Sequence, residues 1–197
     1  MRLVVDWDGT VTVRDSLVQV IHEFGDPALL AELEPRVGVD LTLHEEIALE
    51  FLAITTPLEE VARWVVRNVE VRPGLRELAE LAPVVISAGF HELIEPVLAR
   101  EGMELNVRAN RLDARPDGWV VHFRDEADCA TCGEPCKRGS LAGEPYVYVG
   151  DGYSDRCAAL AADRVFARDA LARHLDGLGV AYEPFETLHD VREALER

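Results

Sequence analysis

The sequence predicts an α/β fold in which a parallel sheet is covered by helices on both faces, with a small helical insert after the first strand. From residue 73 onward, helical and strand patterns alternate, which is typical of a parallel sheet between two helical layers. Residues 14–72, by contrast, carry only helical patterns. We therefore expect a three-layer core of residues 1–13 and 73–197 and an α-helical cap of residues 14–72.

The composition fits one domain of ordinary size with a substantial core, because 48% of the 197 residues are hydrophobic. The formal net charge is −17, and a chain this acidic repels nucleic-acid phosphates and anionic lipid, so both partners are disfavoured. No stretch approaches the ~18 continuous apolar residues of a transmembrane helix. Asp6 and Asp8 interrupt the short apolar segment at the N-terminus, so we expect no signal peptide and a cytoplasmic location. The oligomeric state has no signal in the sequence.

The first elements are a strand and a series of helices. The apolar run at residues 3–5 predicts a buried strand. Asp15 is a candidate N-cap, and Gly25 a candidate stop, for the first helix of the insert. A second apolar stripe covers residues 43–52, and residues 56–59 (Thr-Pro-Leu-Glu) predict a capping box with proline at the first helical position.

The rest of the chain alternates between helices and strands. Pro73 and Gly74 mark the return from the insert to the core. We expect a helix at 75–81, a strand at 84–87, a helix at 91–99, a β-hairpin at 104–123, strands at 146–149 and 164–167, and a last helix at 189–196.

Two carboxylates follow the first strand directly. Asp6 and Asp8 are separated by one residue and precede Gly9. Alternate residues of an extended chain point the same way, so both carboxylates converge at the carboxyl end of the strand. Ligands of open α/β sheets bind at these strand ends. Two neighbouring anions repel each other unless a cation or a shared proton offsets the charge. The pattern favours a ligand site, and a surface turn begun by Asp and Gly is the alternative.

Three further segments carry polar residues where the core elements begin or end. The strand at 84–87 ends in Ser87-Ala88-Gly89, and the strand at 146–149 runs into Gly-Asp-Gly-x-x-Asp at 150–155. Lys137 is the only lysine among 20 basic residues. A position that keeps lysine against this bias indicates a need for a compact ammonium group, the alternative being a surface lysine without a role.

These four segments resemble, in order, the four motifs of the haloacid dehalogenase-like (HAD) phosphohydrolases. Residues 6–12 fit motif I (DxDGT), Ser87 fits motif II, Lys137 fits motif III, and residues 150–155 fit motif IV. The resemblance implies a Rossmann-like core and a C1 cap, as in the subclass (IB) that contains phosphoserine phosphatase. It also implies a Mg²⁺-dependent phosphomonoesterase that acts on a small phosphorylated metabolite.

The resemblance further implies a role for each motif residue. Asp6 would be the nucleophile that forms an aspartyl phosphate. Asp8 would protonate the leaving oxygen and later deprotonate the attacking water. The implied phosphate-binding residues are Ser87, Ala88, Gly89 and Lys137. The implied Mg²⁺ site comprises Asp6, Asp8 through its carbonyl, Asp151 and Asp155, of which the last orients Lys137 or a metal-bound water.

Three cysteines lie in the eight residues that precede Lys137: Cys129, Cys132 and Cys136. This spacing indicates a structural Zn²⁺ site if a fourth ligand is near. The candidates for that ligand are Cys157, His122 and Asp128. A disulfide within the cluster and free thiols are the alternatives, and a reducing cytosol favours the thiols.

The cysteines also resemble those of two groups within the family. One comprises the 2-hydroxy-3-keto-5-methylthiopentenyl-1-phosphate phosphatases of methionine salvage, and the other the phosphocholine/phosphoethanolamine phosphatases. Residues 6–12 and 165–169 look like segments of the first group, with Ala88 and Gly152 as departures. Substrates of these two groups, phosphoserine, and transfer of the phosphoryl group to another alcohol all remain open. A non-catalytic zinc-dependent binding module is the alternative of another class.

Overall fold

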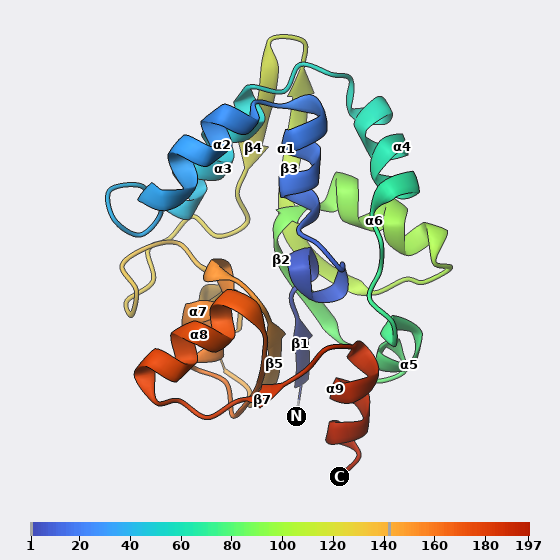
Figure 1. The fold of residues 1–197 in the computed structure, drawn as a ribbon, viewed down its shortest axis with the longest axis vertical. Coiled ribbons are helices and arrows are strands. Elements are labelled where there is room, and N and C mark those ends of the chain that lie inside the picture. Colours follow the sequence, from blue (N-terminus) through green and yellow to red (C-terminus); the bar gives the residue numbers. More distant parts are fainter. Residues whose placement is uncertain (1, 142) are drawn as a thin grey trace.

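A seven-stranded sheet lies at the centre of the structure, with helices around it (Figure 1). The computed structural model describes residues 2–141 and 143–197, so residues 1 and 142 of the expected core lie outside the described residues. The strand order is β4-β3-β2-β1-β5-β6-β7, and every neighbouring pair is parallel except β3 and β4. The strands are β1 (Arg2–Val5), β2 (Val84–Phe90), β3 (Asn106–Arg115), β4 (Gly118–His122), β5 (Tyr146–Gly150), β6 (Arg164–Ala167) and β7 (Glu183–Pro184). The predicted fold class is confirmed.

Alternate residues of the central strands enter two separate hydrophobic cores. In β1, Leu3 and Val5 belong to one core and Val4 to the other, because successive side chains of a strand point to opposite faces. Both faces of the sheet are therefore buried, as a parallel sheet requires. The first core contains side chains of α5 (Leu75–Ala79), α6 (His91–Arg100) and α9 (Leu188–Leu195), and the second those of α7 (Arg156–Ala159) and α8 (Asp169–Leu178).

The segment between β1 and α5 is helical, as expected, and Figure 1 shows these helices above the carboxyl end of β1. They are α1 (Ser16–Phe24), α2 (Pro27–Leu33), α3 (Leu43–Leu52) and α4 (Leu58–Asn68). Asp15 caps α1, accepting hydrogen bonds from the backbone N–H groups of Leu17 (2.8 Å) and Val18 (3.0 Å), and Gly25 ends the helix. None of the described helices is both long and apolar enough to cross a membrane.

The capping box predicted at residues 56–59 is wrong. Helix α4 begins one residue later than that box requires, so Pro57 occupies the N-cap and the described residues provide no side-chain cap. The carbonyl of Thr56 instead accepts a hydrogen bond from the Trp119 indole at 3.0 Å. A capping box does form at α3, where the Glu45 N–H donates to the Thr42 hydroxyl (3.2 Å) and the Thr42 N–H donates to the Glu45 carboxylate (2.8 Å).

The β3–β4 hairpin, predicted at residues 104–123, forms at 106–122 and supports the cap. Figure 1 shows it rising from the sheet beside the cap helices. Trp119 of β4 is fully buried, with its ring centroid 6.3 Å from that of Phe51 in α3. The cap therefore packs against this hairpin as well as against the strand ends.

Candidate functional site

The candidate site lies where β1, β2 and β5 end. These strands are adjacent in the order β2-β1-β5 and parallel, so their carboxyl ends meet at one edge. Asp6 follows β1 directly, Ser87 lies within β2, and Asp151 follows β5 directly. The Asp6 N–H donates to the carbonyl of Val149 at 2.9 Å, which fixes the nucleophile candidate against β5. Three of the four predicted motifs therefore come together through sheet topology alone.

An irregular turn over Trp7–Val11 places Asp8 and Gly9 next to Asp151. Gly9 has a φ of +75°, and a Cβ at this position would collide with the carboxylate of Asp151. The Thr10 hydroxyl donates a hydrogen bond to that carboxylate at 2.7 Å. Glycine is required here both for the backbone conformation and for the close approach of the second acidic segment.

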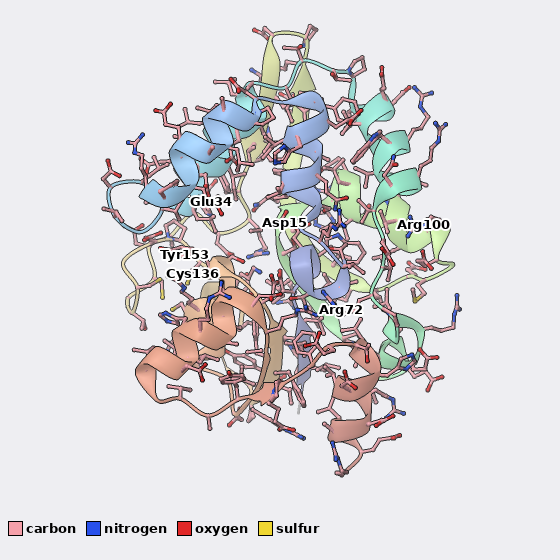
Figure 2. All side chains as sticks on the ribbon, viewed as in Figure 1. Asp15, Glu34, Arg72, Arg100, Cys136 and Tyr153 are labelled. Carbon is pink, nitrogen blue, oxygen red and sulfur yellow. The ribbon has the colours of Figure 1, made fainter. Side chains whose placement is uncertain are left out.

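Arg72 stabilises this turn by hydrogen bonds to its backbone carbonyls. Its buried guanidinium donates to the carbonyls of Thr10 (2.8 Å), Gly9 (2.8 Å) and Glu186 (3.0 Å). Figure 2 shows Arg72 beneath the turn that follows β1. Arg72 was not predicted, because no local pattern distinguishes it from the other eighteen arginines.

Lys137 lies at the centre of the site and is only 3% exposed. Its ammonium group contacts a carboxylate oxygen of Asp6 and lies 2.7 Å from a carboxylate oxygen of Asp155. Burial alone would lower the pKa of Lys137, but the carboxylates of Asp155 and Asp6 raise it above its ordinary value. The lysine is therefore charged at neutral pH and adjoins the nucleophile candidate.

Asp155 is fully buried, and both of its carboxylate oxygens have partners. One oxygen accepts from Lys137 and from the Tyr148 hydroxyl (2.7 Å), and the other from the N–H groups of Asp151 (2.9 Å) and Gly152 (3.0 Å). With four donors already bound, this carboxylate positions Lys137 and the turn after β5. Tyr148 was not predicted, although its place two residues after Tyr146 in a buried strand puts both rings on one face.

Asp8 points to a different set of partners. Its carboxylate accepts hydrogen bonds from the N–H (3.1 Å) and hydroxyl of Ser16, and from the hydroxyl of Ser87 at 3.2 Å. Burial raises the pKa of Asp8, while the hydrogen bonds from Ser16 and Ser87 oppose that effect. The net effect is a pKa of Asp8 above its ordinary value. Ser16, at the start of α1, links the cap to Asp8 and was not predicted.

Three carboxylates of the site form a group that suits a divalent cation. Asp6, Asp151 and Asp155 each offer an oxygen atom, and these atoms lie within 4.8 Å of one another. Burial and the charge of Asp155 raise the pKa of Asp6 above its ordinary value and that of Asp151 to about 7. A hard cation such as Mg²⁺ prefers oxygen ligands and would relieve this repulsion. The carboxylate of Asp8 is not part of the group.

The segment Ser87-Ala88-Gly89 is held in place by two side chains from the hairpin region. The Gly89 N–H donates to the Ser87 hydroxyl at 2.7 Å. The Asn110 amide donates to the Ala88 carbonyl (2.7 Å), and the Arg124 guanidinium donates to the Ser87 carbonyl (3.0 Å). Neither Asn110 nor Arg124 was predicted, because each acts on a backbone carbonyl far away in the sequence.

A cavity of about 450 Å³ separates this site from the cap. Its floor includes Asp6, Asp8 and Asp151. Its cap side carries four more carboxylates: Asp15, Glu34, Glu46 and Glu50. Figure 2 shows Glu34 on the cap and Tyr153 on the core on opposite sides of this space, with Asp15 at the start of α1. The cavity is therefore strongly acidic on both sides.

Two of the cap carboxylates, those of Glu46 and Glu50, are almost completely buried. Glu46 and Glu50 of α3 are 8% and 5% exposed, and Oε1 of Glu50 has no hydrogen-bond partner among the described residues. Burial raises the pKa of Glu50 to about 8, aided by the charges of Glu46, Asp15 and Glu34. Burial and Glu34 raise the pKa of Glu46 to about 7. Sequence reading overlooked both, although acidic residues three and seven positions after Leu43 lie on the face of its apolar stripe.

The cysteines predicted as a group come together. The four sulfur atoms of Cys129, Cys132, Cys136 and Cys157 lie within 4.8 Å of one another, so Cys157 is the fourth member. His122 and Asp128 are not part of this cluster. No disulfide joins the four cysteines, all of which lie in the described chain.

Comparisons with known proteins agree with this geometry. The sequence model of the haloacid dehalogenase-like hydrolases matches residues 3–160, most of the chain. The chain belongs to this family. It is 27% identical over 210 residues to proteins named 2-hydroxy-3-keto-5-methylthiopentenyl-1-phosphate phosphatase from Bacillus cereus (strain AH820) and Bacillus thuringiensis (strain Al Hakam), covering 99% of this chain and 95% of each relative. The family and the phosphatase class predicted from the motifs are thereby confirmed.

Solved structures of other HAD members share the fold. A phosphoserine phosphatase from T. onnurineus has a TM-score of 0.72 at 19% identity, covering 100% of this chain and 94% of that one. A structure described as a phospho-aspartyl intermediate analogue of phosphoserine phosphatase also gives 0.72, at 17% identity, with 98% and 96% coverage. These similarities show that the fold is shared.

Proposed function

We propose that this HAD enzyme is a Mg²⁺-dependent phosphomonoester hydrolase that forms a covalent phosphate on Asp6. The observation that carries the proposal is the contact of the buried Lys137 ammonium with Asp6, beside an Asp8 that is hydrogen-bonded to Ser87. This arrangement puts a nucleophile, a compact cation and a proton-carrying carboxyl in one site. A non-catalytic module would have no need of it.

In this mechanism the carboxylate of Asp6 attacks phosphorus and displaces the alkoxide of the substrate. Asp8, whose pKa burial raises above its ordinary value, protonates the leaving oxygen and then takes a proton from the water that hydrolyses the aspartyl phosphate. Lys137 neutralises charge on the phosphoryl oxygens, and the Ser87 hydroxyl with the N–H groups of Ala88 and Gly89 binds them.

The metal would be held at the acidic strand ends. Asp6 and Asp151 are the carboxylate ligands in our proposal, together with the Asp8 carbonyl that the motif resemblance implies. Asp155 contributes by holding Lys137 and the N–H of Asp151. When bound, Mg²⁺ supplies positive charge to the phosphoryl group. Release of p-nitrophenol from p-nitrophenyl phosphate should stop when Mg²⁺ is chelated and return when it is restored in excess.

The first candidate substrate is 2-hydroxy-3-keto-5-methylthiopentenyl-1-phosphate. Its support is the 27% identity over nearly full length to the relatives that carry this name. We propose that residues 14–72 act as a cap over the core of residues 1–13 and 73–197 and select this substrate. A small metabolite, rather than nucleic acid or a membrane, fits the charge of −17, and we propose a cytoplasmic location.

A second candidate is a phosphomonoester that carries a cationic amine, such as phosphoethanolamine or phosphocholine. The specific observation is the acidic cap side of the cavity, with the buried and unpaired Oε1 of Glu50. An ionised Glu50 without a partner is costly, which is why burial raises its pKa to about 8, and an ammonium group of the substrate would supply the partner that stabilises the ionised form. The neutral thioether tail of 2-hydroxy-3-keto-5-methylthiopentenyl-1-phosphate would not supply such a partner.

A panel of phosphorylated metabolites separates these candidates. If the amine assignment holds, kcat/KM for phosphoethanolamine or phosphocholine should exceed that for neutral phosphomonoesters, and Glu50→Gln should reduce it about tenfold, the effect of ~1.4 kcal/mol. Glu32→Gln is the matched control, because Glu32 is an exposed residue of the same cap. Highest activity on the methylthiopentenyl phosphate, unchanged by Glu50→Gln, would select the first candidate.

A further inference from the structure

Outside the phosphatase site, the four cysteines form a cluster that the proposed reaction does not use. Three lie in the loop before Lys137, and Cys157 lies in α7, two residues after Asp155. We propose that Cys129, Cys132, Cys136 and Cys157 bind one structural Zn²⁺ ion, which fastens the segment carrying Lys137 to the segment carrying Asp155.

The spacing of the sulfur atoms fits one tetrahedral ion. Zn–S bonds of about 2.3 Å place the sulfur atoms of a tetrahedron roughly 3.8 Å apart. The sulfur atoms of Cys129 and Cys157 are 3.8 Å apart, and all four lie within 4.8 Å of one another. Four thiolates in one closed group are typical of a structural zinc site, since no position is left open for water or substrate. Four free thiols have no comparable reason to converge.

The backbone around the first two cysteines is shaped for metal binding. Cys129 and Cys132 are separated by two residues, a common zinc-ligand spacing, and Gly133 follows with a φ of +79°. The Gly133 N–H donates to the Cys129 carbonyl at 2.8 Å, which closes the turn. The Thr131 N–H points at the Cys129 sulfur at 3.4 Å. Hydrogen bonds of this kind stabilise a thiolate and orient it toward a metal.

The loop itself gives a second reason for a cross-link. Residues 123–136, all of them described, contain no helix or strand, and none is fully buried. Phe123 packs against the first core, Arg124 donates a hydrogen bond to the Ser87 carbonyl, and Asp125 accepts one from the Ser140 hydroxyl. Residues 126–136 have no side chain in either core and need another source of order. The residue that follows this segment, Lys137, nevertheless has to occupy a fixed position in the site. A zinc ion shared with Cys157 would supply that order.

The ion would act on the catalytic site through two short connections. Cys136 adjoins Lys137 in sequence, and Cys157 follows Asp155 by two residues. At the other end of these connections, the Lys137 ammonium lies 2.7 Å from Asp155. Cys136, Tyr153 and the first residue of α7, Arg156, line one cavity, and Figure 2 labels Cys136 and Tyr153 in the same region. The four cysteines are therefore positioning residues for Lys137 and not catalytic residues.

Metal content tests the site independently of activity. The enzyme is purified without added metal or chelator, and its metals and free thiols are measured by elemental analysis and thiol titration. We expect about one zinc per chain, and loss of most of it in Cys132→Ser and in Cys157→Ser. Asp6→Asn is the control, because it removes the proposed nucleophile and should keep its zinc. A metal-free protein with four reactive thiols, a disulfide within the cluster, or iron in place of zinc would each overturn the proposal.

A second measurement tests the link to Lys137. Removing zinc with a thiol reagent and a strong chelator, then reducing the thiols, should lower kcat for p-nitrophenyl phosphate at least tenfold, and excess Mg²⁺ should not restore it. One equivalent of Zn²⁺ should restore kcat. The zinc-free protein should also be cut by a protease within residues 123–136 much faster than the zinc form. Unchanged kcat and unchanged cleavage after verified zinc loss would contradict the positioning role. If the protein has no phosphatase activity, metal content and cleavage still decide the zinc proposal.

Discussion

The floor and the cap side of the cavity are both built from carboxylates, but they differ in how those carboxylates are paired. On the floor, Asp155 accepts four hydrogen bonds, and Asp6 contacts a buried lysine. On the cap side, Glu50 is 5% exposed and one of its oxygens has no partner among the described residues. The carboxylates of the floor are thus held by fixed partners, whereas the cap side keeps one unpaired oxygen, which we propose is available to a substrate.

The largest expected effect comes from a substitution on the floor of the cavity. Asp6→Asn should reduce turnover of p-nitrophenyl phosphate by roughly 10⁴-fold, because it removes the proposed nucleophile and a proposed metal-binding charge together. Near-ultraviolet circular dichroism should be unchanged, since Lys137 keeps its bond to Asp155. Activity within tenfold of the wild type would rule out the aspartyl-phosphate mechanism.

Lys137→Arg should have the next largest effect, although it keeps the positive charge. Lys137 is 3% exposed between Asp6 and Asp155, and a planar guanidinium cannot put a compact charge there. We expect a loss of about 100-fold in kcat, or ~3 kcal/mol. Because Lys137 is the only lysine, an amine-selective reagent gives an independent check: phosphate with Mg²⁺ should protect this side chain from modification. Full activity of the modified enzyme would show that Lys137 has no catalytic part.

The prediction for the cap side concerns stability and not catalysis. The pKa of Glu50 is raised from 4.5 to about 8 by burial, so between these values the folded state holds a proton that the unfolded state has lost. The free energy of unfolding must therefore decrease as the pH rises through this window. Replacing Glu50 by glutamine removes that dependence, and Glu50→Gln should be more stable than the wild type by ~4 kcal/mol near pH 9 but by less than ~1 kcal/mol near pH 5.

Urea unfolding at both pH values measures the difference, with Glu32→Gln as the control for removal of one cap charge. An equal difference at the two pH values would mean that Glu50 is solvated or paired in the folded protein. The contrast between the floor and the cap side would then be wrong.

Local pattern was sufficient for residues that stand at the ends of elements. Asp6, Ser87 and Asp151 lie at the ends of apolar runs, and parallel strands bring such ends together whatever the rest of the fold does. The same holds for Asp15 and Gly25, whose roles at the ends of α1 depend only on nearby backbone. These residues were therefore accessible from the sequence.

Residues that act over long distances were not accessible. Arg72 binds carbonyls about sixty residues earlier in the chain, and Arg124 binds a carbonyl of β2, so neither has a local signature. The capping box at residues 56–59 was wrong because a one-residue shift of the helix start, beside the long-range contact of Thr56 with Trp119, removes it. Tertiary contacts decided each of these cases.

The most direct test of the account is chemical identification of the phosphorylated residue. Asp8→Asn should slow hydrolysis of the intermediate, so mixing this variant with p-nitrophenyl phosphate and Mg²⁺ allows it to be trapped. Borohydride reduces an aspartyl phosphate to homoserine, which peptide mass spectrometry locates. We expect homoserine at position 6, only when substrate is present and not in the Asp6→Asn/Asp8→Asn double variant. Hydrolysis of substrate with homoserine at another position, or at none, would contradict the central claim that Asp6 is the nucleophile.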